Sequence, residues 1–331
     1  MATFYDVALA NDQQFFSSRI REFCAQFELS FFLIEPTWAF DFLSKLEERE
    51  IGVRVLIDMS ADAYDIENIY FKIAKEVAEQ GGYVINDPDL SAAASHKGLF
   101  HHTLANNSVL VPPTVIVPRK DIDTFRLTRE ITNQIGTPFV VKPGWGGGRI
   151  GVILDATSED DILRSAKEAI DSDSFLLQRR LTPKQLDSHV AWFRVFYVFG
   201  EVIPCWWEPP ANQYQLVTPL QRKTYHLSAL ARMAREIARL SKVEFFSTEI
   251  TLADDGKFYA VDYLNTDCDM RVKSFWPTGV PDEVVRHIAW ILVEQARDRV
   301  HRSRGVFDHE LLIKDQDWNT RRKKGQLVPG E

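Results

Sequence analysis

Residues 138–152 read PFVVKPGWGGGRIGV, and no other stretch of the chain says as much about the fold. An apolar strand delivers Lys142, a loop containing Gly146, Gly147 and Gly148 follows, and a second apolar strand begins directly after the loop. The lysine ammonium supplies a point charge, and glycine N–H groups approach phosphate oxygens with no Cβ in the way. The stretch therefore predicts a site for a polyphosphate.

Several kinds of phosphate loop share these features, and the flanking sequence separates them. Gly146-x-Gly148-x-x-Gly151 satisfies the dinucleotide fingerprint, but that fingerprint must open a helix, and residues 152–154 predict a strand. The next helix starts only at Ser158 and Asp161, which have capping-box spacing. In a Walker A loop the lysine follows the glycines, and in a protein kinase it lies on the strand after them. The order here predicts a hairpin flap; the alternative is a surface hairpin without a ligand.

Oxygen ligands for a magnesium ion are predicted near the end of the chain. Asp262 ends an apolar strand, Asn265 follows just beyond it, and Glu249 lies on the neighbouring strand of a hairpin turned by residues 254–257. Magnesium prefers one or two carboxylates, with phosphate oxygens and waters completing its shell. The alternative is that Asp262 and Asn265 only cap the turn after a strand.

Arg194 is a cation within the otherwise apolar stretch 192–200. Such an arginine needs a buried anionic partner or a wet cleft. Further along, Arg222 with Lys223 and Arg271 with Lys273 are basic pairs that bind an anionic substrate group or form a solvated face. Arg271 is the stronger candidate, because it lies just beyond the predicted metal strand, and with Arg194 it makes the predicted catalytic pair.

The order strand, lysine, glycine flap, strand resembles the ATP-grasp superfamily, in particular ligases of the ribosomal-protein glutamate ligase and glutathione synthetase type. The resemblance covers roughly residues 85–300 and rests on the segments 86–114, 138–152, 175–181 and 248–265. It implies that Lys97 and Lys142 contact ATP phosphates beneath the flap. It also implies that Gln178, Arg179 and Leu181 hold adenine at a hinge, and that Arg194 meets the transferred phosphate.

The chain departs from the family pattern at three places. Trp192 stands where relatives most often have an acid, so that either this acid's role is absent or Asp187 supplies it. Relatives often have a glutamate where Gln178 stands. Asp262 and Asn265 are three residues apart instead of two, which leaves Asp267 or Asp269 as alternative metal ligands.

The resemblance implies an α/β fold with α+β lobes, in which an N-terminal βαβ domain precedes two lobes that hold ATP between them. We expect a pre-ATP-grasp domain in residues 1–90, a small lobe with the flap in 91–178, a C-terminal lobe with the metal site in 179–303, and a polar tail in 304–331. Hydrophobic periodicity predicts strands at 30–34, 53–58 and 83–86, and helices at 38–50, 66–80, 227–242 and 281–302. Residues 321–324 are expected to be a solvated run or a segment that docks on a partner chain.

Composition limits the classes of protein that remain. The net charge of −8 gives no basic footprint for nucleic acid. Three widely spaced cysteines, Cys24, Cys205 and Cys268, argue against a disulfide framework and favour a reducing compartment. No leader segment or membrane span is evident, so we expect a soluble, cytoplasmic protein that could form a homo-oligomer.

The predicted activity is that of an ATP- and Mg²⁺-dependent ligase. In this chemistry a substrate carboxylate attacks the γ-phosphate to give an acyl phosphate and ADP, and an amine then displaces phosphate to form an amide. The expected partners are a small carboxylate and a small amine. Two alternatives stay open: a small-molecule kinase on the same fold, and a nucleotide-binding protein without catalysis.

Overall fold

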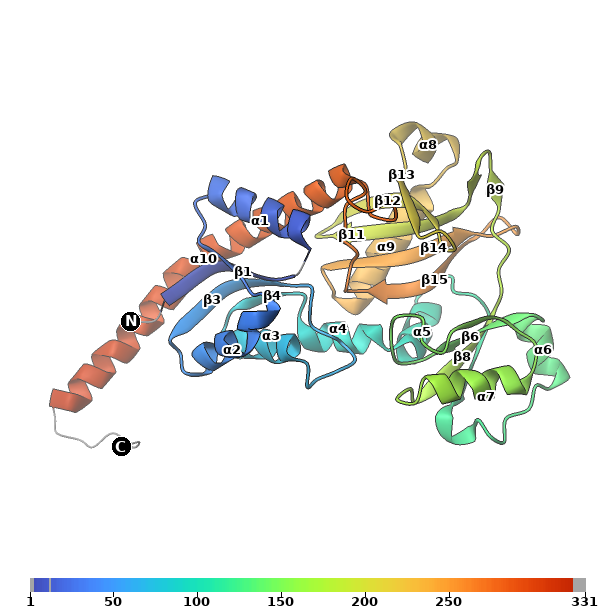
Figure 1. Ribbon diagram of the computed structural model, residues 1–331, viewed down its shortest axis with the longest axis horizontal. Helices are drawn as coiled ribbons and strands as arrows, with labels where there is room; N and C mark the ends of the chain where they lie inside the picture. Colours follow the sequence, from blue (N-terminus) through green and yellow to red (C-terminus); the bar gives the residue numbers. More distant parts are fainter. Residues whose placement is uncertain (1–2, 12, 324–331) are drawn as a thin grey trace.

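The computed structural model describes residues 3–11 and 13–323 of the chain. Its N-terminal part is a parallel sheet with the strand order β2-β1-β3-β4 (Figure 1). The strands are β1 (Thr3–Ala10), β2 (Phe31–Leu33), β3 (Ile51–Asp58) and β4 (Tyr83–Ile85). The helices are α1 (Gln14–Gln26), the short η1 (Pro36–Trp38), α2 (Ala39–Glu47) and α3 (Ile69–Glu79). The strands and helices predicted for this part are confirmed, with ends shifted by a few residues.

Strand β1 and helix α1 have no counterpart among the predicted elements, although β1 is a central strand of this sheet. Asp6 stands in the middle of β1 and interrupts its apolar pattern. Its carboxylate accepts hydrogen bonds from the backbone N–H of Ser30 at 3.0 Å and from Nε of Arg54 on β3 at 3.2 Å. The strand accommodates one buried charge because residues on both sides of it supply donors.

The flap belongs to an antiparallel sheet with the order β5-β8-β6-β7, the small lobe. Helices α4 (Pro88–Ser95) and α5 (Lys97–Asn106) lead into it. Its strands are β5 (Thr114–Pro118), β6 (Phe139–Pro143), β7 (Ile153–Ala156) and β8 (Ser174–Arg179), and its helices are η2 (Arg119–Asp121), α6 (Arg129–Ile135) and α7 (Glu159–Glu168). The glycine loop joins the antiparallel strands β6 and β7, and the capping box of Ser158 and Asp161 opens α7. Both predictions are confirmed.

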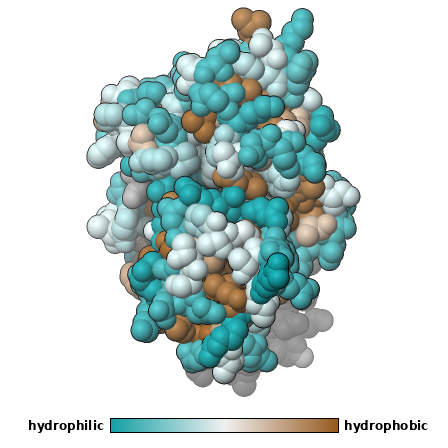
Figure 2. Space-filling view, turned by 90° about the vertical axis from the view of Figure 1, so that its right-hand side faces the viewer, coloured by the Kyte–Doolittle hydropathy of each residue, from teal (hydrophilic) through white to brown (hydrophobic). Residues whose placement is uncertain are grey.

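The large lobe is an antiparallel sheet with the order β13-β12-β11-β14-β15. Its strands are β11 (Trp192–Val198), β12 (Glu201–Glu208), β13 (Gln213–Leu216), β14 (Phe245–Leu252) and β15 (Phe258–Asn265); beside them lie the hairpin of β9 (Gln185–Leu186) and β10 (His189–Val190) and the helices α8 (Pro219–Thr224) and α9 (Ser228–Ser241). The predicted hairpin of β14 and β15 is confirmed. The end face of the molecule that the two lobes form is mostly hydrophilic, with hydrophobic residues in small separate groups (Figure 2).

The last helix, α10 (Asp282–Lys323), runs beyond residue 302, where its end is predicted. Residues 304–323 of the predicted polar tail therefore continue the helix, and residues 324–331 lie outside the described part of the chain. The first half of α10 packs along α1 and the N-terminal sheet, with Trp290 edge-on to Phe23 at 5.2 Å between ring centroids (Figure 1). Within residues 3–11 and 13–323, neither α10 nor any other helix has a stretch long and apolar enough to cross a bilayer.

Polar contacts also fix the N-terminal sheet to the large lobe. The amide nitrogen of Asn86, just beyond β4, donates to the carbonyl of Phe245 at 2.5 Å, and its amide oxygen accepts from the N–H of the same residue at 2.8 Å. Arg299 of α10 donates to the hydroxyl of Tyr83 at 2.9 Å and to Glu244 at 3.2 Å. These bonds hold β4, and Asn86 just beyond it, against the start of β14.

Candidate functional site

Three charged side chains lie in register across the large-lobe sheet. Arg194 on β11 pairs with Glu249 on β14, and Glu249 pairs with Asp262 on β15. Residues directly opposite each other on antiparallel strands share a face of the sheet, so these three side chains belong to one face. We refer to Arg194, Glu249 and Asp262 as the charged row.

Glu249 is the anion that the buried arginine requires. Nη2 of Arg194 donates to Oε1 of Glu249 at 2.6 Å, and the indole Nε1 of Trp192 donates to Oε2 at 2.9 Å. The arginine and glutamate side chains are only 11% and 12% exposed. Burial lowers the pKa of Arg194, but Glu249 and, to a smaller extent, Tyr214, Asp262 and Cys268 raise it, and together they outweigh burial, so that the pKa is raised. Trp192, which replaces the acid of the family pattern, therefore secures Glu249 in place.

Asp262 has its carboxylate free of hydrogen bonds from the described residues. The neighbouring carbonyl of Val261 accepts from Nζ of Lys142 at 2.6 Å. Burial lowers the pKa of Lys142, and the carboxylates of Asp262 and Glu249 oppose this effect. The small-lobe lysine thus reaches the strand that carries Asp262, and its role towards phosphate stays a prediction.

Lys97 meets the flap at the start of α5. Its Nζ donates to the carbonyl of Gly146 at 2.8 Å, and its backbone N–H donates to the carbonyl of Gly144 at 2.8 Å. Its charge also lowers the pKa of Lys142, although less than burial does. The two predicted phosphate lysines and the glycine loop are therefore brought together between the lobes.

The flap reaches from one lobe to the other. Gly146 and Gly148 have φ angles of +114° and +64°, which side chains with a Cβ rarely adopt. At the tip, Nη2 of Arg149 lies 3.4 Å from the carbonyl oxygen of Pro209 and 3.5 Å from Oδ1 of Asn212, both in the turn between β12 and β13. The loop therefore covers the space above the lysines and touches the large lobe at its far end.

In the structure, the side chains of Gln178 and Arg179, which belong to the predicted adenine hinge, form hydrogen bonds with other residues of the protein. Gln178 is 2% exposed, and its amide nitrogen donates to the hydroxyl of Tyr263 at 2.9 Å. The backbone N–H of Arg179 donates to Pro113, and its guanidinium donates to carbonyls of α6. Arg179 and Leu181 line an open depression of about 470 Å³ beside residues 135–138. The role of these residues toward adenine stays a prediction.

Three other predicted site residues, Asp187, Arg271 and Asn265, are not members of the charged row. Asp187, in the exposed turn between β9 and β10, accepts a hydrogen bond from the hydroxyl of Tyr225. Arg271 is paired with Asp269 through two bonds of 2.9 and 2.8 Å. Asn265 ends β15 opposite Ser247.

Among the described residues no group of three or more histidine, cysteine, aspartate or glutamate side chains could hold a metal ion. Asp262 and Glu249, with the amide oxygen of Asn265, nevertheless fit magnesium. This ion takes few protein carboxylates and completes its shell with phosphate oxygens and water.

Tyr64 is a residue of the site that sequence reasoning missed. It comes from the loop after β3 in the N-terminal domain, and its ring lies edge-on to Trp145 of the flap at 4.9 Å. Nζ of Lys97 lies 5.5 Å from the centre of the same ring. No periodic pattern marks this loop, so only the fold could show that an N-terminal residue supports the flap and its lysine.

A buried histidine beneath the lysines makes the fold sensitive to acid. Nδ1 of His101 lies 2.6 Å from the hydroxyl of Tyr263. Burial lowers the pKa of His101 from 6.5 to about 4, and His102 adds a smaller effect. The unfolded chain therefore binds the proton more readily than the folded chain, and stability falls as the pH falls from 6.5 towards 4.

Between pH 7 and pH 5, His101 is expected to cost the wild-type protein about 2 kcal/mol of its free energy of unfolding. A His101→Gln variant has no proton to gain and should lack this part of the loss. Urea denaturation of both proteins at the two pH values measures the difference. His301→Gln, which changes an exposed histidine of α10, is the control and should follow the wild type. Equal acid sensitivity in the His101→Gln variant would show that His101 does not titrate as described.

No family model and no curated protein matches the sequence. Solved structures do match the fold. The ATP-grasp ligase PsnB, in complex with precursor peptide PsnA2 and AMPPNP, aligns with a TM-score of 0.59 at 14% identity, over 90% of this chain and 97% of that one. D-alanine–D-alanine ligase from Bacillus anthracis, in complex with ATP, aligns with a TM-score of 0.59 at 12% identity, over 92% and 99% of the two chains.

A RimK domain ATP-grasp protein from Sphaerobacter thermophilus DSM 20745 aligns with a TM-score of 0.57 at 17% identity, over 86% of this chain and 99% of that one. All three likenesses extend over most of both chains. The chain therefore has the ATP-grasp fold, and the predicted fold class is confirmed.

Proposed function

We propose that the protein is an ATP-dependent ligase that joins a carboxylate to an amine through an acyl phosphate, with release of ADP and phosphate. One observation carries the proposal: Lys142 of the small lobe reaches the strand that carries Asp262 of the charged row, while Lys97 binds the glycine flap. Cations and bare backbone on one side and carboxylates on the other are the groups that bind a nucleoside triphosphate with its magnesium ion.

Each part of the site has a role in this chemistry. Lys97 and Lys142 hold the phosphate oxygens, while the flap excludes water from the transferred phosphoryl group. Asp262 and Asn265, with Glu249, would hold magnesium, and the ion would neutralise charge on the phosphates. Phosphoryl transfer needs mainly positioning and neutralisation of charge, so a site without a covalent nucleophile is sufficient.

Arg194 is placed to stabilise the charge that develops on the transferred phosphoryl group. Its Nη2 is bound to Glu249, whereas its buried Nε has no hydrogen-bond partner among the described residues. A buried guanidinium with an unused donor beside Asp262 suits an anion that arrives with the substrate.

The second candidate function is nucleotide binding without catalysis. Both oxygens of Glu249 are already engaged by Arg194 and Trp192, and this favours a role for Glu249 in holding the arginine over a role in holding a metal. Such a protein would bind ATP and turn nothing over.

Release of ADP and of free phosphate from magnesium-ATP tests the proposal. The assay uses pooled carboxylates crossed with pooled amines, and the pools include peptides because PsnB and the macrocyclase MdnC are both found with precursor peptides. Release of both products that needs one acid and one amine is the expected result. It should be absent in Lys142→Ala and retained in Lys120→Ala, which changes an exposed lysine of the same lobe.

The other outcomes of this assay decide between the remaining functions. ADP without free phosphate would identify a kinase. No product from any pool, with ATP binding intact, would identify a binding protein and overturn the ligase.

A further inference from the structure

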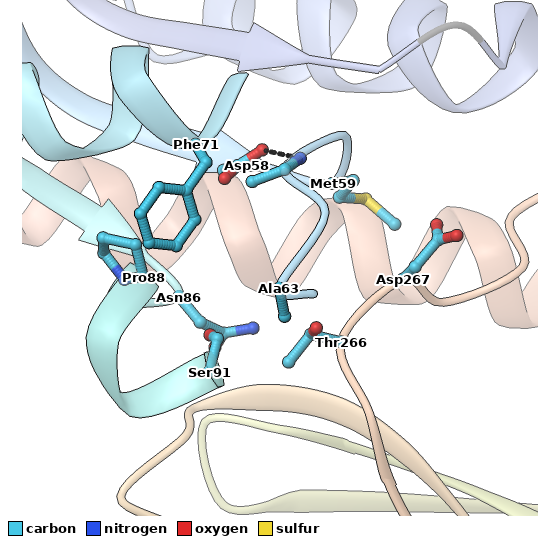
Figure 3. Close-up of a pocket in the computed structure, with 10 residues that line it drawn as sticks. Asp58, Met59, Ala63, Phe71, Asn86, Pro88, Ser91, Thr266 and Asp267 are labelled. Atoms are coloured by element: carbon cyan, nitrogen blue, oxygen red, sulfur yellow. Dashed lines mark hydrogen bonds between the residues drawn. The ribbon is translucent and has the colours of Figure 1, made fainter. Parts of the chain in front are cut away.

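The loop that directly follows β3 has a backbone fixed by two carboxylates. Oδ1 of Asp58, the last residue of β3, accepts hydrogen bonds from the N–H groups of Ser60 at 3.0 Å and Ala61 at 2.9 Å (Figure 3). Oδ1 of Asp62 then accepts from the N–H of Tyr64 at 2.8 Å. Carboxylates that bind the backbone two or three residues further on stabilise tight turns. The side chain of Tyr64 therefore starts from a fixed position.

Ala63, the residue before Tyr64, packs this loop towards the large lobe. It is 8% exposed and lines a cavity of about 20 Å³, which Thr266 lines from the large-lobe side (Figure 3). Thr266 directly follows β15, the strand that carries Asp262. The loop thus lies between the N-terminal sheet and the large lobe, and its position depends on both.

The same loop reaches the flap through the ring of Tyr64. The ring lies edge-on to Trp145, and a Cβ added to Gly147 would stand 3.4 Å from its Cε2 atom. The small lobe holds Trp145 as well, because its N–H donates to Oγ of Ser172 at 3.1 Å and its ring lies 5.4 Å from that of His96. The base of the flap is therefore held between the small lobe and the N-terminal domain.

The ammonium of Lys97 lies over the ring of Tyr64. Its Nζ is 5.5 Å from the ring centre and 3.5 Å from the hydroxyl oxygen, and it donates to the carbonyl of Gly146 at 2.8 Å. A lysine has a flexible four-carbon stem, so the groups that its ammonium contacts decide where its charge lies. The negative face of an aromatic ring attracts such a cation. The ring of Tyr64 and the carbonyl of Gly146 together determine the position of this charge.

We propose that Tyr64 is a positioning residue of the nucleotide site, which places the ammonium of Lys97 and the base of the flap for the phosphates of ATP. The inference rests on the proposed function and adds to it a contribution from the N-terminal domain. Tyr64 acts through Lys97 and Trp145 and does not itself contact the nucleotide. Because Ala63 packs towards the residues after β15, the arrangement of the N-terminal domain and the large lobe decides whether this small-lobe lysine is in place.

Titration calorimetry with magnesium-AMPPNP on variants of the full chain tests the proposal. Tyr64→Leu keeps an apolar side chain without a π-face and is expected to weaken binding about five- to tenfold, because a cation–π contact is lost. Tyr64→Phe keeps the ring and should bind within about twofold of the wild type. Ile66→Ala, which changes an exposed residue of the same loop, is the matched control and should bind as the wild type does.

A double-mutant cycle shows whether the ring of Tyr64 positions Lys97 or only packs in the fold. Lys97→Met removes the charge and keeps most of the stem, and in this background Tyr64→Leu should lose most of its effect on AMPPNP binding. An undiminished effect of Tyr64→Leu in the Lys97→Met protein would overturn the proposal. So would wild-type affinity in the Tyr64→Leu protein. Thermal unfolding checks that every variant is folded.

Hydrogen exchange of the backbone amides of residues 145–151 separates a failure of this inference from a failure of the proposed function. A wild-type protein that binds no AMPPNP would overturn the ligase. In that case faster exchange in Tyr64→Leu, with wild-type exchange in Ile66→Ala, would still support Tyr64 as the residue that holds the flap. Equal exchange in all three proteins would remove Tyr64 from that role.

Discussion

Lys142→Ala is expected to weaken ATP binding by about one to two decades in a protein that still folds. The ammonium of Lys142 ends beside Val261, where burial lowers its pKa and the carboxylates of Asp262 and Glu249 oppose that shift. A charge-assisted hydrogen bond from this group to a phosphate contributes about 1.5–3 kcal/mol. That free energy corresponds to roughly a ten- to hundredfold change in Kd. Titration calorimetry with magnesium-ATP measures it.

Two further variants make this result specific. Lys142→Met keeps most of the side-chain volume between the lobes and should lose affinity as the alanine variant does, because only the charge and its donors are removed. Lys120→Ala should bind ATP normally. Unchanged affinity in a folded Lys142→Ala protein would remove this lysine from the nucleotide site.

The largest effect on stability is expected for Arg194→Met, which should lower the free energy of unfolding by about 3–5 kcal/mol. The variant leaves the Glu249 carboxylate nearly buried with only the indole of Trp192 as a donor. Burying an unpaired charge costs more than the ion pair itself contributes, since the pair offsets its own desolvation. Urea denaturation at pH 7 gives the difference.

A double variant shows whether the destabilisation comes from the unpaired Glu249 charge or from lost packing of the Arg194 side chain. Arg194→Met combined with Glu249→Gln removes both charges and should recover most of the lost stability, although any turnover would remain abolished. Equal destabilisation in the single and double variants would mean that lost packing against Trp207, which lies 5.2 Å below the guanidinium, is the cause.

The parts of the site that the sequence predicted are those with a local pattern. The flap is readable because two apolar strands frame its glycines, and the strands β14 and β15 are readable because a four-residue turn joins them. Alternation alone would place Val261 opposite Glu249; a bulge in β15 puts Asp262 there instead, and the sequence gives no signal for that bulge. Arg194 could be singled out because a charge in an apolar strand demands a partner.

The missed features depend on contacts between distant segments. Strand β1 carries Asp6, whose partners Ser30 and Arg54 are visible only in the folded sheet. Gln178 stands at the predicted hinge, yet its amide is bound to Tyr263, 85 residues further on. Tyr64 meets Trp145 only because the N-terminal domain folds over the flap. Spacing along the chain carries no signal for such pairs.

The packing of α10 on α1 has a consequence for folding during synthesis of the chain. The N-terminal sheet shares one hydrophobic core with residues of α10, so that Phe16 and Ile20 are covered together with Ile288 and Leu292. These partners are separated by nearly the whole sequence, and long-range contacts form late because the intervening loop must close first. The first strands to leave the ribosome therefore wait, with one face uncovered, until the last helix has been synthesised.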